Sequence, residues 1–202
     1  FGTIDREPMD SDVPANSWAL ALPAEGDGAL MVATRTKYGF RGTDDTLAVS
    51  LIRSSYDPDP LPEVAIHRFS FAVSAVPAAA PSASIIREVQ NGNHPLLPLS
   101  GTVHAGTLPT AAGFAAQDGN EVLVSAYKLA EDGSGDALLR VYECDGKRAE
   151  ASFTFARAIR HAAFADINER PVGTSAVIKA DGNTLCFEVG AYASATVRIK
   201  FA

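Results

Sequence analysis

Alternation of apolar and polar residues with a period of two dominates this chain and limits what it can fold into. In "EASFTFA" the residues Ala151, Phe153 and Phe155 fall on one face of an extended segment, and "ATVRIKF" repeats the pattern with Val197 and Ile199. A period of two is typical of strands with one buried face, whereas a helix repeats every 3.6 residues. Both segments are therefore predicted to be half-buried antiparallel strands.

Similar strand-like runs recur along the chain and are separated by short turn sequences. The turns read "EGDG", "GTDD", "EDGSGD", "CDGK" and "ADGN", which favour hairpins. The expected fold class is mainly β, with one antiparallel β-sandwich or two. The further predicted strands cover 16–22, 28–35, 46–53, 66–76, 121–129, 137–144, 159–168 and 183–190.

Length and composition exclude several classes of protein. The chain has 202 residues, of which 47% are apolar and 20% are charged, as expected of a globular protein with one sizeable core or two small ones. Its formal charge of −7 argues against binding to phosphate backbones. No apolar run is long enough to span a bilayer, and no signal peptide is recognisable. A soluble protein, located in the cytoplasm, is expected. The opening "FGTIDREP" already alternates like a strand, so the chain is interpreted as a piece of a longer protein.

One segment interrupts the strand rhythm. "SASIIREVQNG" has a Ser at its start and a Gly at its end, which predicts one short helix. The Gly, Thr and Pro content that follows, over 100–113, is typical of a linker. The predicted domains are residues 1–105 and 106–202.

The cysteines and histidines form no recognisable metal or catalytic motif. Cys144 and Cys186 lie in strand-like runs, where reduced buried thiols are the first interpretation and a cross-strand disulfide the alternative. His67 is expected to be a satisfied core or interface residue. The remaining histidines, His94, His104 and His161, are not spaced like zinc ligands.

Acidic pairs are present, but none is a complete glycosidase site. Such a site needs two carboxyl groups facing each other across a sugar, and neighbours in one turn cannot be assumed to do so. The pairs Asp44 with Asp45 and Glu131 with Asp132 are interpreted mainly as solvated turn residues. Asp57 and Asp59 are each followed by Pro, which stiffens the loop.

Several of these segments, in their order along the chain, resemble the C-terminal β region of α-mannosidases of glycoside hydrolase family 38. They are "GALMVATRTKYGF", then "TLAVSLIRSSYDPDP" and "HRFSFAV", followed by "SAYKLAEDG", "LLRVYECDG" and "CFEVGAYASATVRI". "FGTIDR" also fits the strand that begins this part of the family. The sequence departs from the family pattern at Ala33, Thr34 and Arg35, and again at 64–66, before His67.

The resemblance implies a division of labour within a longer enzyme. Residues 1–105 would be the C-terminal half of a β-supersandwich related to galactose mutarotase, and 106–202 a terminal β-sandwich. The nucleophilic aspartate and the zinc of these retaining enzymes would lie in an N-terminal catalytic domain outside this chain. No cofactor is therefore expected here, and the expected partners are that domain and, through it, α-mannoside glycans. The alternative is a free-standing carbohydrate-binding or interaction β-sandwich.

Residues in and beside the "KYGF" and "SYDPDP" segments are the candidates to face the substrate cleft or the neighbouring domain. The resemblance implies that a basic residue from this neighbourhood points toward the cleft. The loop after Arg53 would suit a domain interface, although it would equally suit a cap on the sandwich. No catalytic or metal-binding residue is predicted. The candidates are Arg35, Lys37, Tyr38, Arg41, Arg53, Tyr56, Asp57 and Asp59.

Overall fold

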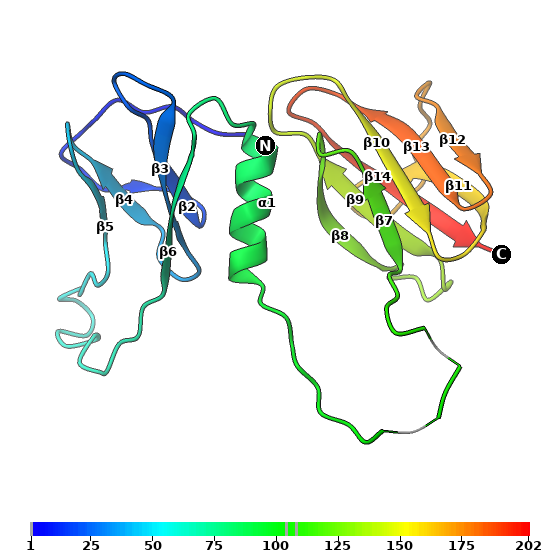
Figure 1. Cartoon of the computed structure of the whole chain (residues 1–202), viewed down its shortest axis with the longest axis horizontal. Coiled ribbons are helices and arrows are strands. Elements are labelled where there is room, and N and C mark those ends of the chain that lie inside the picture. The colour runs from blue at the N-terminus through cyan, green and yellow to red at the C-terminus, as the bar shows by residue number, and fades with distance from the viewer. Residues whose placement is uncertain (1, 104, 108) are drawn as a thin grey trace. The chain divides into compact units, whose positions relative to one another are not determined.

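The computed structural model of the chain describes residues 2–103, 105–107 and 109–202 (Figure 1). It divides into two compact units. The N-terminal unit comprises Ile4–Ala80 and Ile85–Leu97, and the C-terminal unit is built mainly from Pro98–Ala202. Among the described residues, no helix combines the length and the apolar character needed to cross a membrane.

The N-terminal unit contains two three-stranded antiparallel sheets. One has the order β2 (Trp18–Ala21), β3 (Gly28–Thr34), β6 (Phe71–Pro77), and the other the order β1 (Val13–Pro14), β4 (Gly39–Gly42), β5 (Leu47–Val49). The single helix of the described chain, α1 (Ser82–Asn93), covers one face of the first sheet through Ile85 and Val89. The sheet residues beneath it alternate along β3 and β6 and are Ala29, Met31, Ala33 and Val76.

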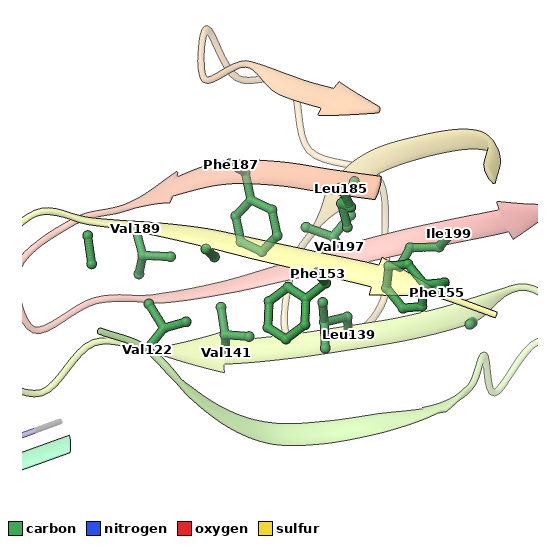
Figure 2. Packing of buried hydrophobic residues seen from close by; sticks show 13 residues of the cluster. Val122, Leu139, Val141, Phe153, Phe155, Leu185, Phe187, Val189, Val197 and Ile199 are labelled. Carbon is green, nitrogen blue, oxygen red and sulfur yellow. The ribbon is translucent and has the colours of Figure 1, made fainter. Parts of the chain in front are cut away.

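The C-terminal unit is a sandwich of two four-stranded antiparallel sheets. The first has the order β12 (Ile178–Asp181), β13 (Thr184–Val189), β10 (Ala149–Phe155), β7 (Ala115–Asp118). The second has the order β11 (Ile159–Ala165), β14 (Ser194–Phe201), β9 (Ala137–Tyr142), β8 (Leu123–Leu129). Figure 2 shows side chains of both sheets meeting in one core. Because β9, β10, β13 and β14 contribute alternate residues to that core, the period-two pattern of these strands is explained directly.

The alternation predicted for the C-terminal strands is confirmed. Ala151, Phe153 and Phe155 of β10 are buried, as are Val197 and Ile199 of β14. Aromatic rings complete the core with edge-on contacts, because Phe164 meets Phe187 at 5.8 Å between ring centroids and Phe155 meets Phe201 at 5.3 Å. Such edge-to-face pairs stabilise a core beyond the burial of their area.

Strand boundaries in the first half of the chain differ from the prediction. The strand expected over 46–53 is limited to Leu47–Val49, and the one expected over 66–76 begins only at Phe71. Residues 2–9, expected to open a strand, have no strand structure. A strand needs a hydrogen-bonded neighbour, and a local pattern does not guarantee one. The predicted helix is confirmed over Ser82–Asn93. The predicted domain boundary at 105/106 lies after Leu97, where the N-terminal unit ends.

A buried carboxylate ties together two turns of the C-terminal unit. Glu143 follows β9, is 1% exposed, and accepts hydrogen bonds from the backbone N–H groups of Asp145, Gly146 and Tyr192 at 2.6, 3.1 and 2.8 Å. Burial opposes ionisation of this group, but the backbone donors outweigh burial and hold the pKa of Glu143 below its ordinary value. The charge is therefore a structural element that joins the β9–β10 and β13–β14 connections.

Candidate functional site

The turn between β3 and β4 displays three of the predicted candidates. Thr34 is buried, and its hydroxyl accepts hydrogen bonds from the N–H groups of Thr36 and Lys37 at 3.3 and 3.2 Å. This side-chain bond shapes the turn locally. Arg35, Lys37 and Tyr38 are consequently held on the surface, and the Tyr38 hydroxyl donates to the Arg35 carbonyl at 3.5 Å. The structure thus brings these three residues together on one rigid turn.

Lys37 and Arg41 differ from Arg35 in being engaged by other side chains. The Lys37 Nζ lies 4.6 Å from the centroid of the Phe69 ring, within the range of a cation–π contact. The Arg41 guanidinium pairs with Asp10 at 3.1 Å and with Asp12 at 3.0 Å. Within the described residues the Arg35 side chain makes no hydrogen bond or ion pair, so its guanidinium group is available to a ligand or a neighbouring domain.

Asp12 organises the surface of the sheet that contains β4. Its carboxylate accepts a hydrogen bond from the Ser50 hydroxyl and another from Arg41. These two bonds, with Ser50 contributing most, hold the pKa of Asp12 below its ordinary value. The charge of Arg53 acts in the same direction, which associates the start of the predicted loop with this cluster. Sequence reasoning missed Asp10 and Asp12, because they lie about thirty residues before their partners.

The loop over 53–60 is exposed and carries no helix or strand. Tyr56 is 86% exposed, and the Asp57–Pro58 peptide bond is cis. Asp59 accepts the N–H of Leu61 at 3.0 Å, a turn that fixes its carboxylate locally. The loop therefore presents Arg53, Tyr56 and Asp57 to its surroundings without adding to the core of the N-terminal unit.

His67 is held by local contacts, and the two cysteines are not joined to each other. His67 Nε2 donates to the Glu63 carbonyl at 2.8 Å, and its ring stacks on Phe69, so it is satisfied but only half-buried. Cys144 and Cys186 are reduced thiols. His104 lies outside the described residues. No group of three or more His, Cys, Asp and Glu side chains in the described part of the chain is placed to hold a metal ion.

A charged hollow in the C-terminal unit was not predicted. It has a volume of about 420 Å³ and lies between the β8–β9 turn and the turn after β11. Glu131 and Asp132, interpreted from sequence as solvated turn residues, lie at its edge together with Glu169, Arg170 and Arg198. The "EDG" turn was recognisable in the sequence. The hollow was not, because the residues that contact this turn lie up to 66 residues away along the chain.

Comparisons with known proteins agree with the fold. Residues 121–199 match the family described as "Glycosyl hydrolases family 38 C-terminal beta sandwich domain". Over 149 residues the chain is 26% identical to the protein named "Alpha-mannosidase G" of Dictyostelium discoideum, a stretch that covers 71% of this chain and 13% of that protein. The chain thus spans about an eighth of the length of this relative. The resemblance inferred from sequence is confirmed at the level of a family 38 C-terminal region.

Proposed function

Because residues 121–199 form a family 38 C-terminal β-sandwich domain, we propose that the chain is the non-catalytic C-terminal β region of a zinc-dependent, retaining α-mannosidase. In this proposal it supports the catalytic domain of the same polypeptide, and its N-terminal unit borders the substrate cleft. The zinc and the nucleophile would belong to the catalytic domain. The relative of D. discoideum, whose printed name is that of an α-mannosidase and whose length far exceeds the matched region, supports this proposal.

The observation that carries the proposal is a partly exposed apolar face on the N-terminal unit. In the ladder between β3 and β6, Thr34 lies opposite Phe71, Val32 opposite Val73 and Leu30 opposite Ala75, so these residues share the face that α1 does not cover. On this face Leu30 is 44% exposed, Phe71 39% and Val73 65%, whereas Val32 and Thr34 are buried. β6 is also the last strand of its sheet, and an apolar edge strand favours addition of a further strand.

The loop beyond β5 also exposes apolar side chains. Ile52 is 47% exposed, Leu61 69%, Val64 78% and Ile66 93%. Large exposed apolar patches mark interaction surfaces in soluble proteins. We assign this surface to the contact with the remainder of the enzyme. Arg35, whose guanidinium group is unengaged, is the basic residue we assign to the substrate cleft.

Substitutions on this face provide the test. In the α-mannosidase polypeptide that contains this region, Val73→Asp should lower the yield of folded enzyme and its turnover of a nitrophenyl α-mannoside, because a carboxylate would be buried in an apolar interface. In the isolated chain the same substitution should leave the unfolding transition nearly unchanged and lower the binding of a hydrophobic dye. Ile167→Asp is the matched control, because Ile167 is 68% exposed in the C-terminal unit.

Two results would contradict the proposal. The first is full activity of the Val73→Asp enzyme, which would mean that the face is not an interface. The second is turnover of the α-mannoside by the purified isolated chain, because a non-catalytic region has no such activity.

A further inference from the structure

The charged hollow of the C-terminal unit is formed by two turns and one strand. Glu131 and Asp132 come from the β8–β9 turn, Asn168, Glu169 and Arg170 from the turn after β11, and Arg198 from β14. The hollow is an open depression of about 420 Å³ on the surface of the sandwich. Both turns belong to the same compact unit, so the hollow is a fixed feature of the sandwich.

Arg198 is held rigidly in the hollow. Its Nε donates to Asp136 at 2.8 Å, and its Nη2 donates to Asp132 at 2.7 Å and to Ser134 at 2.8 Å. The Arg198 side chain is 23% exposed. A guanidinium group fixed in this way presents its remaining N–H groups at a defined angle, so a ligand that accepts from them meets little entropic cost.

Glu169 joins the two turns. Its carboxylate accepts the backbone N–H of Glu131 at 2.7 Å and pairs with Lys128 at 2.6 Å, while Lys128 also contacts the Glu131 carboxylate. Glu169 is only 12% exposed at its side chain and has a φ of 68°, a backbone conformation unusual for a residue with a side chain. The two turns therefore keep one spacing, and the hollow between them is preorganised.

The ionisation of these groups favours binding over proton transfer. Hydrogen bonds from Ser134 and then from Arg198 lower the pKa of Asp132 to about 2. The backbone N–H of Glu131 and the Lys128 ammonium lower the pKa of Glu169. Both carboxylates are therefore charged at neutral pH and are poorly suited to act as general acids. Three carboxylates and two guanidinium groups line the hollow, and Lys128 offsets part of the negative charge, so neither a free cation nor a free anion is strongly favoured.

Two side chains at the rim are not engaged. Among the described residues, Asn168 and Arg170 make no hydrogen bond or ion pair through their side chains. The carboxylates of the hollow accept hydrogen bonds, the guanidinium groups of Arg170 and Arg198 donate them, and the Asn168 amide can do both. A hydroxyl group donates one hydrogen bond and accepts others, so neighbouring hydroxyl groups on a ring can pair with both kinds of partner at once.

We propose that this hollow binds a neutral polyhydroxylated ligand, a hexose unit of a glycan. Asp132 and Glu169 accept hydrogen bonds from its hydroxyl groups, while Arg198, Arg170 and Asn168 donate to them. None of the described residues that line the hollow is aromatic, so the affinity should be on the order of millimolar. This site is separate from the candidates on the N-terminal unit. Only the choice of an α-mannoside as the first probe rests on the proposed function.

Titration of the isotope-labelled chain with methyl α-mannoside, methyl α-glucoside and methyl β-galactoside tests the site by NMR. We expect at least one hexoside to give saturable shifts of the amide signals of the 130–136 and 166–171 turns by about 100 mM. Asn168→Ala combined with Arg170→Ala should weaken binding about tenfold or more, because two contacts to the sugar are lost. Arg148→Ala is the matched control, since Arg148 pairs with Glu188 on the other sheet and is 74% exposed.

The proposal fails if no hexoside saturates these signals, or if the double variant binds as tightly as the unaltered chain. It also fails if sulfate produces the same shifts more strongly than every hexoside, because the hollow would then be an anion site. Binding of a glucoside or galactoside instead of the mannoside supports the site. Such a result would not bear on the proposed function, which is tested by the turnover of a nitrophenyl α-mannoside. The sugar site and the proposed function can therefore be refuted independently.

Discussion

Replacement of Glu143 by Ala should destabilise the C-terminal unit by about 3 kcal/mol. The carboxylate is the acceptor for three backbone N–H groups, those of Asp145, Gly146 and Tyr192, in a site where Glu143 is 1% exposed. A buried donor left without an acceptor costs about 1 to 3 kcal/mol, so three donors at the lower limit amount to about 3 kcal/mol. Water entering the space left by the side chain keeps the loss near that limit. For a unit of about 100 residues, which Pro98–Ala202 approximates, the corresponding fall in Tm is about 12 to 24 °C.

Glu143→Gln separates the contribution of charge from that of shape. The amide retains one acceptor oxygen but directs an NH₂ group toward N–H donors, so we expect an intermediate loss of about 1 to 2 kcal/mol. Glu188→Gln is the control, because Glu188 is 67% exposed and pairs only with Arg148 at the surface. Its stability should change by less than about 0.5 kcal/mol.

Native-state hydrogen exchange is the suitable assay, because it resolves the two units. The amides of β9 and β14 report the free energy of unfolding of the C-terminal unit, and those of β3 report the N-terminal unit. We expect Glu143→Ala to lower the free energy of unfolding measured at the β9 and β14 amides and to leave that of the β3 amides unchanged. If Glu143→Ala changes their exchange free energy by less than about 0.5 kcal/mol, the carboxylate does not hold the turns.

The contacts of Glu143 also predict how the stability of the C-terminal unit depends on pH. The pKa of Glu143 is lower in the folded protein than in the unfolded chain, because backbone donors favour the charged form despite burial. The carboxylate therefore contributes its full stability above its ordinary pKa of about 4.3, and the contribution is lost as the pH falls through the lower folded value. The unaltered chain should lose more stability on acidification than the Glu143→Gln variant, which lacks the titrating group.

Three further outcomes are expected. Tyr56→Ala with Asp57→Ala should change stability by about 0.5 kcal/mol or less in urea unfolding, because Tyr56 is 86% exposed, and a larger loss would make the loop a structural cap. Gly146→Ala should lower Tm, since Gly146 has a φ of 74° and an added Cβ would lie 2.7 Å from the Tyr192 ring; an unchanged Tm would contradict this. Phe153→Ala should cost about 3 to 5 kcal/mol in the exchange of β10 amides, because it empties part of the core; a loss below about 1 kcal/mol would contradict close packing there.

The face that each C-terminal strand buries could be read from the sequence, because burial repeats with the pleat of a strand. The residues of β10 and β14 that alternate in sequence are those that alternate in the core. The helix from Ser82 was also predictable, because the residues that start and end it are neighbours in the sequence. Prediction failed where an extended segment lacks a partner strand, as in 2–9 and 66–70.

The candidate residues on the N-terminal unit illustrate what local reasoning can and cannot reach. The grouping of Arg35, Lys37 and Tyr38 follows from their adjacency in one turn. The engagement of Arg41 by Asp10 and Asp12 does not, because it depends on the pairing of β1 with β4. Their assignment to a cleft or an interface stays a prediction.

The sequence by itself determined a mainly β chain, the buried faces of its C-terminal strands and a resemblance to one enzyme family. Only the tertiary structure decided which charges meet. Glu143 and Tyr192 are 49 residues apart, and Arg198 and Asp132 are 66 apart, yet both pairs are in hydrogen-bond contact. Side-chain periodicity is a property of a single strand, whereas such contacts depend on strand order and register. The contacts of Glu143 and the charged hollow therefore arise only when β8, β9, β14 and β11 pair in one sheet.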